Sequence, residues 1–321
     1  MATTNQPGPA VSAGTLQTTP PVKSRLNPIF TGPNGLRAGW RLLIFLLLLS
    51  IPAAALLLVA RSHAHPAASQ VTLTPFLLSM NDALLLLILV GVTWIMGKIE
   101  HSRFAEYGLP VAQAFRKDFW IGTLVGFLAI SSTLLLMFIL HVFRVTGFAL
   151  HGMAALSSLG GWGLAFTLSG LFEEFAFRGY AQYTLASGIG FWPAALVLSA
   201  LFGLAHLLLD SNENVVGSVA VVLFGLLLCF FLRTTGSLWC AVGFHVSYDW
   251  GQTSFYGVPD SGIVPYHNFM NSALTGPQWL TGGSIGPEGS IITPFVLLIA
   301  ALLVSRYYRR HRSHVEKPNA I

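Results

Sequence analysis

The chain has 321 residues, of which 54% are hydrophobic and only 9% are charged. Soluble domains carry about 25% charged residues, so this composition excludes an ordinary soluble domain and predicts a polytopic membrane protein. The formal net charge is +5, and the 17 basic residues are few for a chain of this size, which argues against nucleic acid as a partner. Both cysteines, Cys229 and Cys240, lie in apolar segments, so we expect buried structural thiols rather than a disulfide framework or a CxxC metal motif.

Residues 1–37 are rich in Thr, Pro, Gly and Ala and show no apolar periodicity, which predicts a disordered N-terminal tail. Eight apolar segments follow, and each approaches the ~20 residues that a helix needs to cross the hydrocarbon core. We therefore predict an all-α fold, a polytopic transmembrane helical bundle that occupies residues 38–308 as one domain, followed by a basic tail at 309–321. The predicted spans are residues 39–60, 74–97, 119–142, 161–185, 191–209, 215–232, 237–256 and 291–308.

The basic residues predict the orientation of these spans, because cytoplasmic loops are enriched in Lys and Arg. With the N-terminus in the cytoplasm, 14 of the 17 basic residues fall on the inside. We therefore expect an integral multi-pass protein of the bacterial plasma membrane with both termini in the cytoplasm. The loop at 257–290 then lies outside, where it could partly re-enter the membrane as a lid. The inside residues are Lys23, Arg25, Arg37, Arg41, Lys98, Arg103, Arg116, Lys117, Arg233, Arg306, Arg309, Arg310, Arg312 and Lys317.

Ionisable side chains within spans are costly and usually mark function, and three of the predicted spans hold nearly all of them. The fourth span contains SGLFEEFAFRGY, with Glu173, Glu174 and Arg178. Glu174 and Arg178 are four residues apart and share a helix face, whereas Glu173 is rotated by about 100°. We expect Arg178 to hold Glu174 as a structural pair, which leaves Glu173 to face a wet cavity and exchange protons.

The fifth and seventh spans carry the other polar groups. FGLAH places Phe202 and His206 four residues apart, and HVSYD does the same for His245 and Asp249. If both helices pack on the fourth span, two imidazoles and two or three carboxylates converge, and their estimated depths in the membrane allow this. We expect His141, at the end of the third span, to be a packing residue. Solvated positions in loops or tails are expected for His63, His65, His101, His151, His267, His311 and His314.

This set of groups predicts hydrolysis. The chain has neither the GxSxG nucleophile motif nor the HExxH zinc motif, but a glutamate, two histidines and an aspartate can activate water and stabilise an oxyanion. Glu173 would take the proton from water with help from His206, and His245 and Asp249 would face the carbonyl oxygen. We favour a reaction without a metal. The alternative cofactor is zinc, for which Glu173, His206 and His245 are suitable ligand types.

These stretches resemble the motifs of a known family. EEFAFRG (residues 173–179), FGLAH (202–206) and HVSYD (245–249) are similar to the EExxxR, FxxxH and HxxxN/D motifs of the CAAX protease and bacteriocin-processing family, whose intramembrane proteases include the eukaryotic Ras-converting enzyme. The motifs occur in the family's order, each within a span, and the resemblance covers about residues 160–255. It implies a helical bundle with a cavity open to the cytoplasmic side.

The resemblance also implies a role for each matching residue. Glu173 and His206 would activate water, and His245 and Asp249 would stabilise the transition state. The remaining motif residues, Glu174, Arg178 and Phe202, would support them. The eukaryotic enzyme has Asn where this chain has Asp249, and an ionised Asp is a poor oxyanion stabiliser unless it is protonated or orients His245.

We therefore expect a membrane-embedded endopeptidase whose partners are the lipid bilayer and a membrane-associated or lipidated peptide. Two other classes stay open. One is a non-catalytic scaffold or bacteriocin self-immunity protein with the same fold, and the other is a transporter or proton relay. A scaffold need not keep Glu173, His206 and His245 together, and the sequence shows no clear inverted repeat of the kind common in transporters. The motifs thus favour the enzyme, while the substrate and its prenylation cannot be derived from them.

Overall fold

The computed structural model describes residues 29–32, 35–63, 74–209, 214–261 and 267–312. Most of the predicted N-terminal tail and the last residues of the basic C-terminal tail lie outside these ranges. Residue contacts divide the chain into two units, Met1–Arg37 and Ala38–Ile321. The described part of the first unit is a short antiparallel pair, β1 (Thr31–Gly32) and β2 (Gly35–Leu36).

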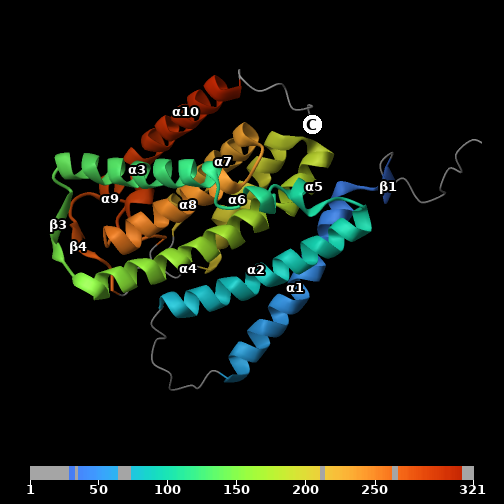
Figure 1. The fold of residues 1–321 in the computed structure, drawn as a ribbon, viewed down its shortest axis with the longest axis horizontal. Coiled ribbons are helices and arrows are strands. Elements are labelled where there is room, and N and C mark those ends of the chain that lie inside the picture. The colour runs from blue at the N-terminus through green and yellow to red at the C-terminus, as the bar shows by residue number, and fades with distance from the viewer. Residues whose placement is uncertain (1–28, 33–34, 64–73, 210–213, 262–266, 313–321) are drawn as a thin grey trace, which may run out of the picture. The chain divides into compact units, whose positions relative to one another are not determined.

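The second unit is a helical bundle, as predicted (Figure 1). Within the described residues, six helical stretches are long and apolar enough to cross a membrane: residues 75–100, 117–139, 152–189, 191–209, 215–235 and 292–311. The main helices are α1 (Ala38–His63), α2 (Pro75–Glu100), α3 (Lys117–Ile139), α4 (Gly152–Arg178), α5 (Tyr180–Ile189), α6 (Phe191–Leu209), α7 (Val215–Thr235), α8 (Trp239–Trp250) and α10 (Ile292–Arg312).

Two predicted spans differ from the helices in detail. The fourth span was expected to run unbroken over residues 161–185, but α4 ends at Arg178 and α5 begins at Tyr180. The break falls at Gly179, where an added Cβ would lie 2.3 Å from the carbonyl oxygen of Phe175. The seventh span consists of the 12-residue α8, which continues as a π-helical turn, Gly251–Phe255.

Helix α4 lies at the centre of the functional region because it packs against α2, α6 and α8. Helix α8 packs most extensively against α3, and α7 contacts α6, α8 and α10. Most residues of α8 are buried, and its polar side chains His245 and Asp249 face the cavity described below. The free cysteines Cys229 and Cys240 are buried here too, in α7 and α8.

Glycines allow α3 and α8 to approach closely. A Cβ added at Gly122 would lie 2.0 Å from the carbonyl oxygen of Cys240, and one at Gly126 would lie 2.3 Å from that of Phe244. From the other side, a Cβ at Gly243 would lie 2.1 Å from the carbonyl oxygen of Phe119. Small residues at four-residue spacing are a common means of packing helices within a bilayer. This contact fixes α8, and with it His245 and Asp249.

The remaining elements depart from a purely helical fold. Strand β3 (Phe143–Phe148) pairs antiparallel with β4 (Met270–Leu274), with Phe143 opposite Leu274 and Phe148 opposite Met270. In Figure 1 this pair lies at the end where α3 finishes and α4 begins. Shorter elements are the 3₁₀ turns Phe104–Tyr107, Val111–Gln113 and Pro287–Gly289, and α9 (Gln278–Thr281).

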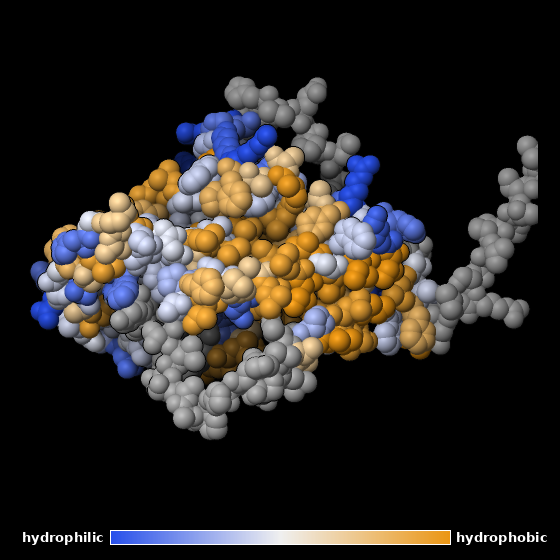
Figure 2. Space-filling model, turned by 60° about the horizontal axis from the view of Figure 1, so that its bottom comes forward, coloured by the Kyte–Doolittle hydropathy of each residue, from blue (hydrophilic) through white to orange (hydrophobic). Residues whose placement is uncertain are grey.

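The surface of the bundle suits a lipid environment. Figure 2 shows hydrophobic side chains over much of one face, and many large apolar residues are exposed, such as Phe76, Leu87, Trp94 and Leu128. Soluble monomers rarely expose contiguous apolar areas of this kind. The protein is therefore an integral membrane protein.

Candidate active site

Glu174 and Arg178 form a buried ion pair on α4. The Nη1 atom of Arg178 lies 3.1 Å from Oε1 of Glu174, and both side chains are fully shielded from solvent. The guanidinium also stacks on the ring of Phe202, 4.4 Å from its centroid. It fits because residue 225 of α7 is a glycine, where an added Cβ would lie 2.4 Å from Nη2 of Arg178. The pairing expected from the four-residue spacing is thus present.

His245 joins α8 to this pair. Its Nδ1 atom lies 2.8 Å from Oε1 of Glu174, and its Nε2 atom lies 3.1 Å from Oδ2 of Asp249, one helical turn further on. An ionised carboxylate only accepts hydrogen bonds, so this arrangement suits an imidazolium that donates from both nitrogens. The four side chains form a continuous chain of alternating charge, from Arg178 through Glu174 and His245 to Asp249.

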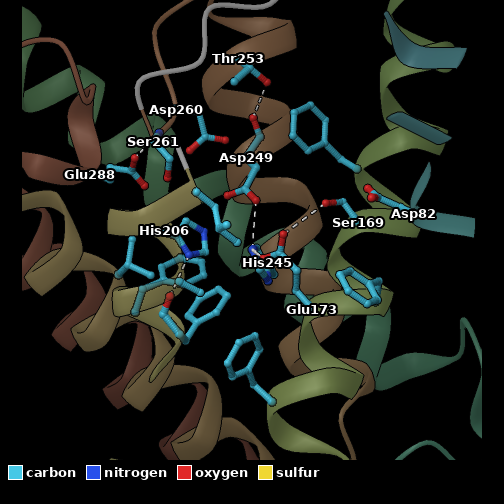
Figure 3. Close-up of a pocket in the computed structure, with 18 of the residues that line it drawn as sticks. Asp82, Ser169, Glu173, His206, His245, Asp249, Thr253, Asp260, Ser261 and Glu288 are labelled. Atoms are coloured by element: carbon cyan, nitrogen blue, oxygen red, sulfur yellow. Dashed lines mark hydrogen bonds and ion pairs between the residues drawn. The ribbon is translucent and has the colours of Figure 1, made fainter. Parts of the chain in front are cut away.

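Glu173 occupies a different environment from its neighbour. Its side chain is 26% exposed, whereas that of Glu174 is fully buried. One carboxylate oxygen accepts a hydrogen bond from Ser169 at 3.4 Å, and the other lies 3.7 Å from Nε2 of His245. Figure 3 shows Glu173 beside His245, in the lining of a cavity. The two adjacent glutamates are divided as the sequence indicated, one paired and one facing the cavity.

His206 lines the same cavity from α6. Its Nδ1 atom lies 3.0 Å from the carbonyl oxygen of Phe202. A carbonyl can only accept, so Nδ1 carries the hydrogen and, in the neutral ring, Nε2 keeps its lone pair. The Phe202 ring separates His206 from Arg178, with ring centroids 4.5 Å apart on the histidine side. His206 therefore presents a basic nitrogen without competing for the buried ion pair.

The cavity has a volume of about 520 Å³, which falls within the range of typical ligand pockets. Its walls come from α2, α4, α6, α7, α8, α10 and the segment between α8 and α10. Apolar side chains such as Trp162, Phe166 and Phe224 form much of the lining. The sequence-predicted residues that line it are Glu173, Phe202, His206, His245 and Asp249, while Glu174 and Arg178 lie behind the wall.

Three carboxylates that the sequence reasoning passed over also line this cavity: Asp82, Asp260 and Glu288. The sequence could have marked Asp82 as a candidate site residue, because it is an ionisable residue within a predicted span. It gives no such indication for Asp260 and Glu288, since they lie in the Gly- and Pro-rich segment 257–290 and reach the cavity only through folding. Burial raises the pKa of Asp260 well above its ordinary value, and the negative charges of Asp249 and Glu288 raise it further.

The suggested zinc ligands do not form a metal site. Among the described residues, no group of three or more His, Cys, Asp or Glu side chains is arranged so that it could hold a metal ion. His245 directs both ring nitrogens at carboxylates, and Nδ1 of His206 is engaged by a carbonyl. The donor set of Glu173, His206 and His245 therefore does not fit zinc, and no step below involves a metal.

Comparison with known families identifies the central part of the chain. Residues 155–251 match the family model described as type II CAAX prenyl endopeptidase Rce1-like. These residues form a Rce1-like domain of the CAAX protease family. The Rce1-like domain extends from α4 to the end of α8 and contains all three motifs. The resemblance drawn from those motifs is thereby confirmed, and the family is one of proteases. A search of curated proteins finds no match.

Proposed function

We propose that this protein is an intramembrane endopeptidase that hydrolyses peptide bonds of membrane-associated or lipidated peptides, with water activated by Glu173 and His206. The observation that carries the proposal is the division of the two adjacent glutamates. Glu173 faces a cavity shared with His206, while Glu174 is locked in the chain that holds His245. A fold that needed these charges only for packing would have no reason to direct Glu173 into a cavity.

In this mechanism Glu173 is the general base. Its carboxylate takes a proton from a water molecule in the cavity, and the lone pair on Nε2 of His206 orients that water. The water oxygen attacks the carbonyl carbon of the peptide, and a tetrahedral oxyanion forms. When the carbon–nitrogen bond breaks, the leaving amine takes the proton from Glu173, which returns to its starting state. General acid–base catalysis of this kind contributes about 10²–10⁴-fold.

His245 stabilises the oxyanion. Its Nε2–H lies between Asp249 and Glu173, at the edge of the cavity, where an oxyanion in the cavity can share this donor with Asp249 while the ring stays in place. Asp249 then acts as a positioning residue that holds the ring, rather than as a direct partner of the oxyanion. Glu174 and Arg178 hold the same ring from its other nitrogen. Donors fixed before the reaction lose little energy to reorganisation, which is why such arrangements are effective.

We further propose that the protein lies in a bacterial plasma membrane with both termini in the cytoplasm, and that residues 38–308 act as one transmembrane domain. The terminal charges support the orientation, because Arg306, Arg309 and Arg310 end α10 while Arg41 lies in the first turn of α1. Near the same end of the bundle Arg41 pairs with Glu100, the last residue of α2, at 2.7 Å.

Proteoliposomes containing the purified protein test the proposed activity. A panel of quenched membrane-associated peptides, some prenylated, is incubated with wild type and with the double variant Glu173→Gln/His206→Gln, and the products are identified by mass. Cleavage at one defined bond by wild type and none by the double variant is expected. If both folded proteins leave every peptide intact, the endopeptidase proposal fails and a scaffold is favoured. Peptide uptake driven by a pH gradient would instead indicate a transporter.

A further inference from the structure

The cavity around Glu173 is lined by five carboxylates: Asp82, Glu173, Asp249, Asp260 and Glu288. Among the described residues that line it there is no lysine or arginine, and the two histidines are the only bases. His245 is already shared between Asp249 and Glu174. The cavity therefore holds more carboxyl groups than the proposed hydrolysis requires, with few bases to balance them.

Asp82 is the clearest sign that this charge serves a ligand. Its side chain is only 4% exposed; Oδ1 accepts from Asn81 at 2.9 Å, whereas Oδ2 has no hydrogen bond of ordinary geometry and the Ser169 hydroxyl is the side-chain donor near this carboxyl group. Leaving a buried carboxylate oxygen unsatisfied is costly. Figure 3 shows Asp82 directed from α2 toward Ser169 and the cavity. A donor that enters the cavity could complete its hydrogen bonding.

Asp260 and Glu288 lie on the other side of Glu173 from Asp82 (Figure 3). Glu288 accepts a hydrogen bond from the backbone N–H of Ser261, which directly follows Asp260, so the two carboxylates are held near each other. Gln252 donates to Asp260 at 3.2 Å. A bound peptide that passes Glu173 would therefore meet acidic groups on both sides of the bond to be cut.

This charge bears directly on the substrate. A peptide that ends in a free carboxylate close to the scissile bond, as a CAAX terminus does, would add a negative charge to a cavity that lacks lysine and arginine. Like charges in a partly desolvated site repel, whereas a cation would be attracted. The lining is thus suited to a peptide that places a positive charge near Glu173.

We propose that Asp82 on one side of Glu173, and Asp260 with Glu288 on the other, form two specificity subsites for lysine or arginine side chains that flank the cleaved bond, and that these subsites select basic internal segments over C-terminal tripeptides. The idea rests on the proposed peptidase function. Asp82 is its sharpest determinant, because it holds the unsatisfied oxygen and takes no part in the hydrolysis described above.

The test uses matched quenched peptides that differ only in lysine or norleucine at positions flanking the cleaved bond. For wild type we expect kcat/KM to favour lysine by about tenfold or more at low salt, and Asp82→Asn to reduce that ratio to about threefold or less. Asp118→Asn is the matched control, because Asp118 lies at the start of α3, outside the cavity, where its carboxylate accepts a hydrogen bond from the hydroxyl of Tyr308. The control should keep the wild-type ratio. Equal rates on both peptides, or the same ratio in Asp82→Asn as in wild type, would overturn the subsite.

Binding separates this idea from the proposed activity. The Glu173→Gln protein in detergent is titrated with the labelled lysine and norleucine peptides, and fluorescence anisotropy reports their affinities without turnover. The subsite is supported if the lysine peptide binds more tightly than the norleucine peptide and if the double variant Glu173→Gln/Asp82→Asn binds the lysine peptide more weakly. This holds even if wild type proves inactive. Equal binding of both peptides contradicts it, whatever the outcome of the cleavage assay.

A second inference follows independently from where the cavity lies along the helices. On α2 the cavity residues Leu78 and Asp82 are near the first turn, whereas Lys98 is in the last. On α10 Thr293 and Leu297 line the cavity, whereas the basic residues begin at Arg306. On α7 the lining residues lie at 220–224, whereas Arg233 is in the last turn. On these three helices the cavity therefore lies in the half away from the basic ends.

We infer that the peptide reaches Glu173 from the non-cytoplasmic half of the membrane. Basic helix ends mark the cytoplasmic side, and the segment 257–290, which was expected outside, supplies Asp260, Ser261 and Glu288 to the cavity. The resemblance alone implied a cavity open to the cytoplasm. The positions of the lining residues favour the opposite side.

Labelling in intact bacterial cells decides this without any activity assay. Ser261→Cys lies in the cavity lining, and Gln113→Cys is the matched control at the exposed loop before α3. Both native cysteines are buried and give only a low background. A membrane-impermeant maleimide should label Ser261→Cys in intact cells and Gln113→Cys only after permeabilisation. The reverse pattern, or equal labelling of both in intact cells, would overturn the inference.

Discussion

The Nδ1 atom of His245 lies 2.8 Å from Oε1 of Glu174, across the contact between α4 and α8. This hydrogen bond gives the second glutamate of the adjacent pair a task of its own. It fixes the imidazole that Asp249 holds from the opposite nitrogen, and Arg178 balances its charge. Glu173 is then the carboxylate of the pair that remains available to the cavity.

Replacing Arg178 with Gln should destabilise the protein strongly. Glu174 is fully buried, and removal of one partner of a buried ion pair costs about 3–5 kcal/mol because the other charge is left uncompensated. Thermal unfolding in detergent should show a large loss for this single variant. The double variant Glu174→Gln/Arg178→Gln removes both charges and should regain part of the loss. A single variant as stable as wild type would show that the pair contributes nothing to the fold.

Asp249→Asn should retain most activity, whereas Asp249→Ala should not. An Asn side-chain oxygen can still accept the hydrogen bond from Nε2 of His245, which lies 3.1 Å from Oδ2 of Asp249, but Ala cannot. We expect kcat to fall less than about tenfold for Asn and by about 10² for Ala, the usual loss when a stabilising group is misplaced. Equal losses in the two variants would mean that the charge of Asp249, rather than its orientation of His245, is what matters.

Chelators should leave peptide cleavage intact. The candidate ligands Glu173, His206 and His245 do not converge on a shared metal position, so EDTA or phenanthroline should have no metal to remove. The cleavage rate is measured before and after incubation with each chelator, and apo protein is then supplied with Zn²⁺. Complete loss of activity followed by rescue with Zn²⁺ would contradict the metal-free mechanism.

Protein stability should fall as the pH rises, in part because of Asp260. Its pKa is raised in the folded state by burial and by nearby carboxylates, so the folded protein holds this proton more tightly than the unfolded chain does. The resulting stabilisation is present below the ordinary Asp value and is lost as the pH rises toward the raised pKa. In the Asp260→Asn variant, the melting temperature should therefore change less with pH between about pH 5 and pH 8 than it does in wild type. An unchanged slope in the variant would exclude Asp260 as a source.

The pairs within each motif could be predicted from the sequence, because residues four positions apart on a helix lie on the same face. Glu174–Arg178, Phe202–His206 and His245–Asp249 each lie one turn apart, and the structure pairs each of them. The hydrogen bond between His245 and Glu174 joins separate helices, however, and no local pattern encodes it.

The positions of the other cavity carboxylates and the break between α4 and α5 depend on tertiary packing, which the hydrophobic periodicity of the sequence does not predict. Asp260 and Glu288 belong to an irregular segment, and their place in the cavity follows from the packing of the described residues 257–261 and 267–290. The division of the fourth span into α4 and α5 depends on one glycine, Gly179, within a run apolar enough for a single helix. Asp82 was detectable in principle, because any carboxylate in a span calls for an explanation.

The most direct test of the account is the cleavage rate of Glu173→Gln relative to wild type, in matched proteoliposomes at equal amounts of folded protein. The account predicts a loss of about 10²-fold or more, with little change in melting temperature, because Glu173 is partly exposed and its contact with His245 is long at 3.7 Å. Cleavage by Glu173→Gln at the wild-type rate would remove Glu173 from the mechanism and contradict the central claim.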